Sequence, residues 1–455
     1  MVPETTSTHS PDVPLHADDK LKRVIGPFGL GATAVNIAVG AGIFVVPAFV
    51  AAILGPAAIV AYFVCGIAVA LVLTCYIEIG SFVHRSGGGV AYIEEAFGPL
   101  MGFLAWVMYS VGYEVVACGA LAVALLGSLA MWAPALGHGA PRILALFVVF
   151  GGLATVNIIG TRQGLGVAVA STIAKLIPLL LAVVAGIFLV HWRQLRWAGW
   201  PPAAKLGQAS LILFFAFQGL EEALAPSAEI RDPARTVPRA MFGATATVIL
   251  LYVALQLVSQ GVLGDELAQQ TTAPLAAVAG RIVGIGGSTL VSIGIAVSIF
   301  GSLAGGMFSA PRAFFLAAED GTLPAALAKV HPRFRTPHIA ILVVAALMFL
   351  LAASGGFKHL AILSSASILC VYLAVCLGAL KLRYTRKQVP GAFRAPGGPL
   401  IGILGSIVVI WLLSHSTRVE VVALCGTLMV STAYFFARRW YMNRRSAALT
   451  SGPDA

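Results

Sequence analysis

Long apolar runs separated by short polar stretches dominate the chain. The runs are about 20 residues long, and apolar positions do not alternate with polar ones as they would in barrel strands. Twelve such runs lie at residues 25–54, 56–83, 98–131, 141–160, 164–191, 208–230, 238–261, 280–310, 337–354, 357–380, 399–415 and 418–437. This pattern predicts an all-α integral membrane protein with twelve transmembrane helices.

Composition supports membrane insertion and argues against a soluble domain. Hydrophobic residues make up 59% and charged residues 10% of the chain, and the mean hydropathy is +0.93. Soluble domains average about 45–50% and 25%, respectively. The polar residues 1–24 and 438–455 are predicted to be tails, and no cleavable signal peptide is visible at the N-terminal end.

Basic residues concentrate in alternate loops. Of the 29 Lys and Arg residues, 21 fall in segments assigned to one side and seven in segments assigned to the other, while Lys175 lies inside a run. The positive-inside rule therefore predicts a multi-pass cell-membrane protein with both termini cytoplasmic. This distribution also explains the net charge of +11 through topology, without a nucleic-acid partner.

Motifs for enzymatic or cofactor chemistry are not evident. The cysteines all lie in apolar runs without CxxC spacing, which is typical of small buried apolar side chains: Cys65, Cys75, Cys118, Cys370, Cys376 and Cys425. We find no nucleotide-binding loop, metal-ligand cluster or nucleophile triad. The sequence predicts neither catalytic residues nor a metal site nor a cofactor.

The first apolar run contains an unusual central stretch, Asn36–Phe44, which includes Gly40 and Gly42. Glycine is costly in a helix interior because it loses the most backbone freedom there. One interpretation is close packing of two membrane helices. The other is a helix interruption at mid-depth, which in transporters marks the binding site because the freed backbone groups face a ligand or cavity.

A second interruption is predicted in the sixth run, at residues 214–222. Gln218, Gly219, Glu221 and Glu222 follow one another closely in the middle of an apolar stretch. Charged groups at that depth cost several kcal/mol unless they face a cavity or a partner. Matching interruptions five runs apart are expected for two inverted repeats of five helices that meet at a central site.

Four sequence motifs resemble those of the amino acid–polyamine–organocation transporter superfamily. They are "GAGIF" in the first run, "FFAFQGLEEALAPSAEIRDPARTVPRA" at 214–240, "HRSGGGVAYIEEAFGPLMGF" at 84–103 and "SAPRAFFLAAEDGTLPAALAKVHPRFRTPHIAIL" at 309–342. The resemblance covers residues 25–440. It implies a leucine-transporter-type fold, with inverted repeats at 25–191 and 208–380 and two further helices at 399–437.

The resemblance also implies where a substrate amino acid binds. Its carboxylate would contact free N–H groups near Ala41, Gly42 and Ile43, at the positive end of the second half-helix. Its ammonium would contact carbonyl groups near Ile37, Ala38, Gly40, Phe217 and Leu220. Phe217 occupies the position of the family's gating aromatic residue, although it is also consistent with ordinary packing.

Lys175 is the only basic residue in the interior of an apolar run, since every other Lys or Arg within a run lies within two residues of its end. Burial of an ammonium in hydrocarbon is costly, and the residue is about eleven positions from the end of its run, which makes snorkelling difficult. Proton-coupled and exchanging relatives resemble this chain in having such a lysine, which takes the place of a sodium ion. The resemblance therefore implies a coupling role for Lys175 and sodium-independent transport.

The acidic residues within the apolar runs each allow more than one role, or a role that the resemblance implies. Glu114 resembles a glutamate of the cationic-amino-acid branch, and it either contacts a cationic substrate or makes a structural hydrogen bond. Glu221 matches the family's sixth-helix glutamate and is predicted to act in coupling or gating, although Leu220 replaces the usual aromatic residue before it. Glu222 is less typical of the family, and one interpretation is that it pairs with a polar group across the bundle. Glu78 is predicted to be structural.

The function implied is secondary active amino acid transport by alternating access, with proton symport or substrate exchange. Its expected partners are a small amino acid substrate, protons and membrane lipid. Side-chain discrimination is expected from Glu114, Phe217 and Gln218. The alternatives are a polyamine or organic amine transporter and, in a different class, a sensor with a transporter fold, although a sensor usually carries a soluble domain.

Overall fold

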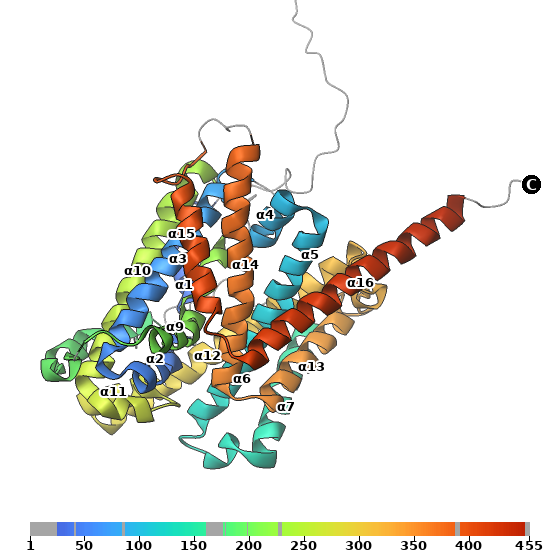
Figure 1. The fold of residues 1–455 in the computed structure, drawn as a ribbon. Coiled ribbons are helices and arrows are strands. Elements are labelled where there is room, and N and C mark those ends of the chain that lie inside the picture. Colours follow the sequence, from blue (N-terminus) through green and yellow to red (C-terminus); the bar gives the residue numbers. More distant parts are fainter. Residues whose placement is uncertain are drawn as a thin grey trace, which may run out of the picture.

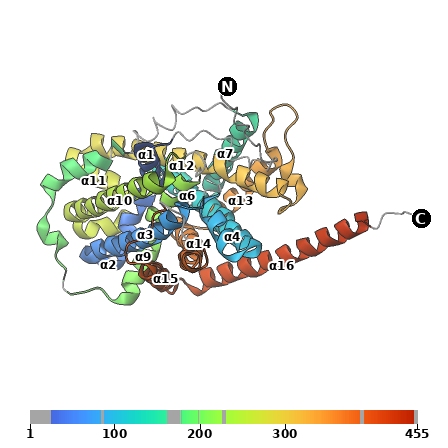
Figure 2. The same ribbon diagram turned by 90° about the horizontal axis from the view of Figure 1, so that it is seen from above.

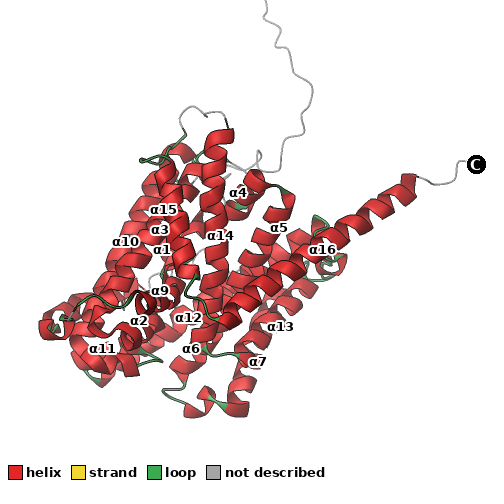
Figure 3. Cartoon of the chain, in the orientation of Figure 1, coloured by secondary structure: helices red, strands yellow, loops and turns green. Residues whose placement is uncertain are grey.

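The computed structural model describes residues 25–40, 42–83, 87–160, 176–177, 179–197, 199–225, 230–386 and 392–450. Two predicted site residues, Ala41 and Lys175, lie outside these residues. The described part of the chain is helical throughout and forms no strand (Figure 3). Its one β-bridge joins Ile25 to Ile230 and ties the start of the first helix to the segment that follows the sixth run.

The α-helices up to residue 160 include both long and short segments. In chain order they are α1 (Pro27–Ala38), α2 (Gly42–Leu54), α3 (Ala58–Gly80), α4 (Gly88–Phe97), α5 (Pro99–Val107), α6 (Val116–Leu129) and α7 (Gly139–Ile159). A π-helical segment, η3 (Met108–Val115), continues α5 into α6.

The later α-helices include the longest ones. In chain order they are α9 (Ala203–Phe217), α10 (Pro233–Leu263), α11 (Pro274–Val283), α12 (Ile285–Glu319), α13 (His338–Ser354), α14 (Phe357–Thr385), α15 (Pro399–Leu413) and α16 (Arg418–Thr450). A short helical segment, η7 (Leu220–Leu224), follows α9, and another apolar helix lies at Leu179–Leu189.

Membrane-spanning character is evident from helix length and apolarity. Among the described residues, eight helical segments are long and apolar enough to cross a membrane, and four shorter apolar helices accompany them. The surface exposes large apolar side chains such as Leu144, Phe147, Leu250 and Leu290, as lipid contact requires. The chain is thus an all-α, multi-pass membrane protein, whereas the twelve-span count stays a prediction.

The helices pack around a central element, α14. It contacts α3, α4, α6, α9, α15 and η3, and it runs through the middle of the bundle when viewed from above (Figure 2). The last helix, α16, lies obliquely against α5 and α14, and its C-terminal part extends beyond the bundle (Figure 1). Tyr434 and Arg438 of α16 donate hydrogen bonds to the backbone oxygens of Thr322 and Gly321.

Contacts between helix ends join segments that the sequence assigns to the same side of the membrane. On the predicted cytoplasmic side, Thr336 Oγ1 donates a hydrogen bond to Ile158 O at 2.7 Å. On the opposite side, Arg142 donates to the oxygens of Ala352 and Gly355, both at 2.9 Å, and caps the end of α13. Each contact joins segments that the sequence assigns to the same side.

Two stretches that the sequence places outside the apolar runs are helical in the structure. The predicted loop at 311–336 begins later than expected, because α12 continues through Pro311 to Glu319. Arg312 therefore lies within a helix, with its Nη1 3.4 Å from Asn157 Oδ1 of α7. The glycine-rich stretch after residue 83 ends in a helix, α4, and Gly87 and Gly88 provide the bend with φ angles of +121° and +54°.

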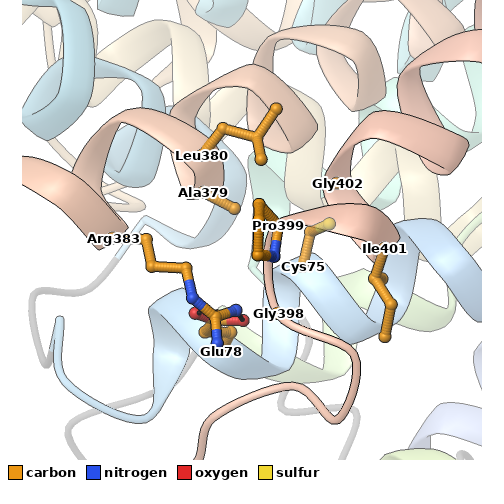
Figure 4. Close-up of a pocket in the computed structure, with 9 residues that line it drawn as sticks. All are labelled: Cys75, Glu78, Ala379, Leu380, Arg383, Gly398, Pro399, Ile401 and Gly402. Atoms are coloured by element: carbon orange, nitrogen blue, oxygen red, sulfur yellow. Dashed lines mark hydrogen bonds and ion pairs between the residues drawn. The ribbon is translucent and has the colours of Figure 1, made fainter.

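Glu78 makes structural contacts with α14 and with the segment before α15, as the sequence predicted. Its carboxylate lies 3.1 Å from Arg383 Nη1 and accepts a hydrogen bond from the N–H of Ala395 at 3.2 Å. The side chains of Glu78 and Arg383 are only 9% and 16% exposed. Figure 4 shows them facing each other in a small pocket between α3, α14 and the start of α15.

We predict that Glu78→Gln lowers the melting temperature (Tm) of the purified protein substantially. Removal of one partner of a buried ion pair leaves the other charge uncompensated, at a cost of about 3–5 kcal/mol. Thermal unfolding in detergent measures the effect, and the double variant Glu78→Gln/Arg383→Gln should recover part of the loss.

The matched control is Glu266→Gln. Glu266 pairs with Arg281 at 2.5 Å, but both side chains are more than half exposed, so its loss should cost about 1 kcal/mol or less. Equal losses of Tm in the two single variants would show that burial of the Glu78 pair does not matter.

Candidate functional site

The predicted interruption of the first apolar run is present. Helix α1 ends at Ala38 and α2 begins at Gly42. The N–H groups of Val39 and Gly40 donate to Val35 O at 2.9 Å and to Ala38 O at 2.7 Å, which closes the last turn of α1. The two half-helices are thus separate elements within one apolar run.

The sixth run is interrupted as well. Helix α9 ends at Phe217, Gln218 is extended, and Gly219 has a φ angle of +101° before the chain enters η7. Only glycine adopts this backbone conformation without strain. The N–H of Gly219 donates to Glu221 Oε2 at 3.1 Å, so a side chain in the same turn accepts one of the freed donors.

The two interruptions meet in space. Helix α1 contacts η7, and α2 contacts α9. A Cβ atom added to Gly219 would lie 3.2 Å from Ile37 Cγ2, and one added to Gly42 would lie 2.8 Å from Ala216 Cα. Gly42 therefore allows the backbones of α2 and α9 to approach closely, and Gly219 leaves room for the Ile37 side chain of α1.

We predict that Gly42→Ala lowers Tm, because the added methyl group would force α2 away from the backbone of α9. Overpacking of this kind costs about 1–3 kcal/mol. Gly426→Ala is the matched control, since a Cβ there would meet nothing within 4 Å and the site is also helical. A Gly42→Ala variant as stable as the control would contradict the close contact.

A cluster of aromatic side chains includes a tyrosine that hydrogen-bonds the backbone of the first interruption. The hydroxyl of Tyr252 in α10 donates to Ala38 O at 2.7 Å. The ring of Phe217 lies between those of Tyr252 and Tyr62, at centroid distances of 5.0 and 6.4 Å, and its side chain is fully buried. Phe217 is therefore packed against α10 and α3, and its role as a gate stays a prediction.

We predict that Tyr252→Phe lowers Tm by removing one of the two hydrogen bonds that the buried Ala38 O accepts, a change that costs about 0.5–1.5 kcal/mol. Tyr62→Phe is the matched control: its hydroxyl is buried and has no hydrogen-bond partner among the described residues. Thermal unfolding of both variants tests the difference. A larger loss of stability in Tyr62→Phe would refute the support assigned to Tyr252.

Glu221 and Glu222 lie where the interruptions meet, among tyrosine hydroxyls. Tyr113 donates to Glu222 Oε1 at 2.6 Å, and Tyr109 also hydrogen-bonds this carboxylate. Tyr372 of α14 lies beside Glu221. Glu222 thus does pair with polar groups across the bundle, as one reading of the sequence proposed.

Gln218 connects the second interruption to α14. Its Nε2 donates to Ser364 Oγ at 3.2 Å, and Ser364 Oγ donates to Tyr113 O at 3.3 Å. The tenth apolar run therefore contributes Ser364 to the junction. Ser367 instead donates to Leu363 O of its own helix.

Glu114 lies in the π-helical segment η3 and accepts a hydrogen bond from Ser309 of α12. This contact is a hydrogen bond between helices, as the structural interpretation of Glu114 expects. Contact of Glu114 with a substrate stays a prediction. Helix α12 also approaches the first interruption, since Ser302 Oγ lies 4.0 Å from the position of a Cβ on Gly40.

Some residues of the junction were missed in the sequence, notably the tyrosines that contact the acidic side chains and the first interruption: Tyr109, Tyr113, Tyr252 and Tyr372. A buried tyrosine hydroxyl usually needs a partner. Tyrosine in the same runs as buried glutamates was therefore an available signal. The roles predicted for Ala41 and Lys175 concern residues outside those described.

Comparison with known proteins identifies similar transporters. A family model described as amino acid permease matches residues 25–438. The serine/threonine exchanger SteT of Bacillus subtilis (strain 168) is 30% identical over 90% of this chain and 95% of its own. The methylthioribose transporter of the same organism is 26% identical over 91% and 93%, respectively. Cationic amino acid transporter 9, chloroplastic, of Arabidopsis thaliana is 28% identical over 69% and 58%.

Proposed function

This chain belongs to the amino acid permease family, and we propose that it is a secondary active amino acid transporter that works by alternating access. The observation that carries the proposal is the contact between two helix interruptions from separate apolar runs. Interrupted helices are tolerated at membrane depth where their backbone faces protein or a ligand, and transporter sites are built in this way. Members of this family are transporters and not enzymes.

The proposed substrate contacts follow from the backbone at the junction. The start of α2, at Gly42 and Ile43, presents N–H groups and the positive end of a helix dipole to a carboxylate. The amine is assigned to carbonyl groups at Ile37, Ala38 and Leu220. Ala38 O already accepts from Tyr252 and from the N–H of Gly40, so an amine at this carbonyl would have to replace one of these two donors.

The energy source proposed is a proton gradient or exchange of substrates, without sodium. This part of the proposal rests on the sequence position of Lys175, together with Glu221 at the second interruption. The full arrangement proposed has twelve helices in a 5+5 inverted repeat plus two, in the cell membrane, with cytoplasmic termini. The cytoplasmic assignment rests on the distribution of basic residues between the two sides.

The main alternative substrate class is a polyamine or another organic amine. Family membership alone does not specify an amino acid, since one similar protein is a methylthioribose transporter. Glu114, Glu221 and Glu222 keep an amine in consideration because they place three acidic side chains in the interior. A transporter-fold sensor, the different-class alternative, would bind ligand without moving it.

Uptake into proteoliposomes tests the proposal. We expect accumulation of at least one of the twenty amino acids under a pH gradient or with internal substrate, and unchanged uptake when choline replaces sodium. Lys175→Ala should abolish or uncouple uptake while the protein remains folded. Uptake of polyamines alone would favour the alternative, and ligand binding without uptake would favour a sensor.

A large loss of uptake without sodium would refute sodium independence. Wild-type uptake with unchanged pH dependence in Lys175→Ala would refute the coupling role.

A further inference from the structure

Glu222 places a carboxylate at the junction of the interrupted helices. Its Oε1 lies 2.6 Å from the hydroxyl of Tyr113 and 3.8 Å from the position of a Cβ on Gly219. That same position is 3.2 Å from Ile37 Cγ2 of α1. The carboxylate therefore faces the point where η7, α1 and the π-helical segment η3 come together.

Among the described residues, the groups around this carboxylate are neutral donors or further acids. Tyr113 and Tyr109 donate hydrogen bonds to it, Glu221 is its neighbour in sequence, and Glu114 interacts with it electrostatically. No ion pair between described residues includes any of these three glutamates. Hydrogen bonds from phenols stabilise an anion but do not neutralise it, and an uncompensated buried charge is costly.

Gln218 supplies a second, independent indication. Its side chain is only 7% exposed, and its Oε1 has no hydrogen-bond partner among the described residues. The proton of Ser364 Oγ is directed to Tyr113 O, so the amide atom facing Ser364 must be the donor. The unpartnered atom is consequently a carbonyl oxygen, and a buried acceptor without a donor costs about 1–3 kcal/mol.

Both acceptors are connected to Tyr113, Glu222 through the tyrosine hydroxyl and Gln218 through Ser364 and the tyrosine carbonyl. A single group that serves both must have positive charge and several N–H donors. An ammonium or guanidinium group meets both requirements. A proton on Glu222 would neutralise the charge but would leave Gln218 Oε1 without a donor. Glu114 is less suited to the role, because its carboxylate is bound by Ser309 of α12.

We propose that Glu222 and Gln218 form a subsite for a cationic group on the substrate side chain. The preferred substrate is then an amino acid with a positively charged side chain. This inference rests on the proposed transport function, since it assumes that the substrate binds at the junction. It assigns side-chain selectivity to Glu222, for which the sequence suggested only a structural pairing.

L-arginine and L-citrulline provide the probe, because they have nearly the same shape and differ in the side-chain charge. The purified full-length protein is titrated with each in sodium-free buffer, and binding is measured by calorimetry. We expect wild type to bind arginine at least about tenfold more tightly than citrulline. Glu222→Gln should weaken arginine binding by about tenfold or more and change citrulline binding less than about twofold.

The glutamine variant keeps an oxygen that can accept from Tyr113, so it removes the charge with little change of shape. Glu266→Gln is the matched control, since the same substitution lies in an exposed ion pair away from the junction. It should bind both ligands as wild type does. Should Glu222→Gln fail to fold, the ratio of arginine to citrulline affinity in wild type, compared with the same ratio in Glu114→Gln, still tests the inference.

Equal affinity of wild type for arginine and citrulline would overturn the inference, as would an equal loss of both in Glu222→Gln. Selective loss of arginine binding in Glu114→Gln but not in Glu222→Gln would assign the subsite to Glu114. That result would also refute the inference. Uptake of neutral amino acids alone by wild type would refute the cationic subsite but not the transport function. Failure to transport any amino acid would refute both the subsite and the transport function.

Discussion

Backbone polar groups released at two helix interruptions are the constraint on which the rest of the interior depends. Hydrocarbon offers them no water, so protein groups must contact them. Tyr252 of α10 donates to Ala38 O, and Glu221 accepts from the N–H of Gly219. These demands place a tyrosine and a carboxylate where apolar residues would otherwise pack, and they explain why α10 and η7 lie against the end of α1.

The interruptions could be predicted because their residues conflict with their surroundings. Gly40 and Gly42, or Gln218 and Gly219, are poor choices for a continuous apolar helix, and each conflict marks a real end of a helix. The contact between the two interruptions was expected only through the inverted-repeat pattern. The distance from Gly219 to Ile37 depends on side-chain packing that no local pattern contains.

The partners of the glutamates and the helix lengths were harder to predict. Tyr113 binds Glu222 across 109 positions of sequence, and tyrosine in an apolar run gives no indication of which acid it will meet. Helix α12 continues past Pro311 because its first residues beyond the apolar run still have neighbours to pack against, such as Phe314, which contacts Trp106. Hydropathy marks where a membrane span ends, whereas packing determines where its helix ends.

In the proposed arrangement, the charge balance of the junction connects selectivity with energy coupling. Glu221 and Glu222 come from one turn of η7, so any cation that neutralises one of them weakens the need for a second cation at the other. A cationic substrate and a proton therefore compete for the same excess of negative charge. An amino acid with a neutral side chain leaves that excess in place, and its transport then needs a proton at the carboxylates. A cationic side chain supplies the charge itself, which favours exchange of one cationic substrate for another over proton symport.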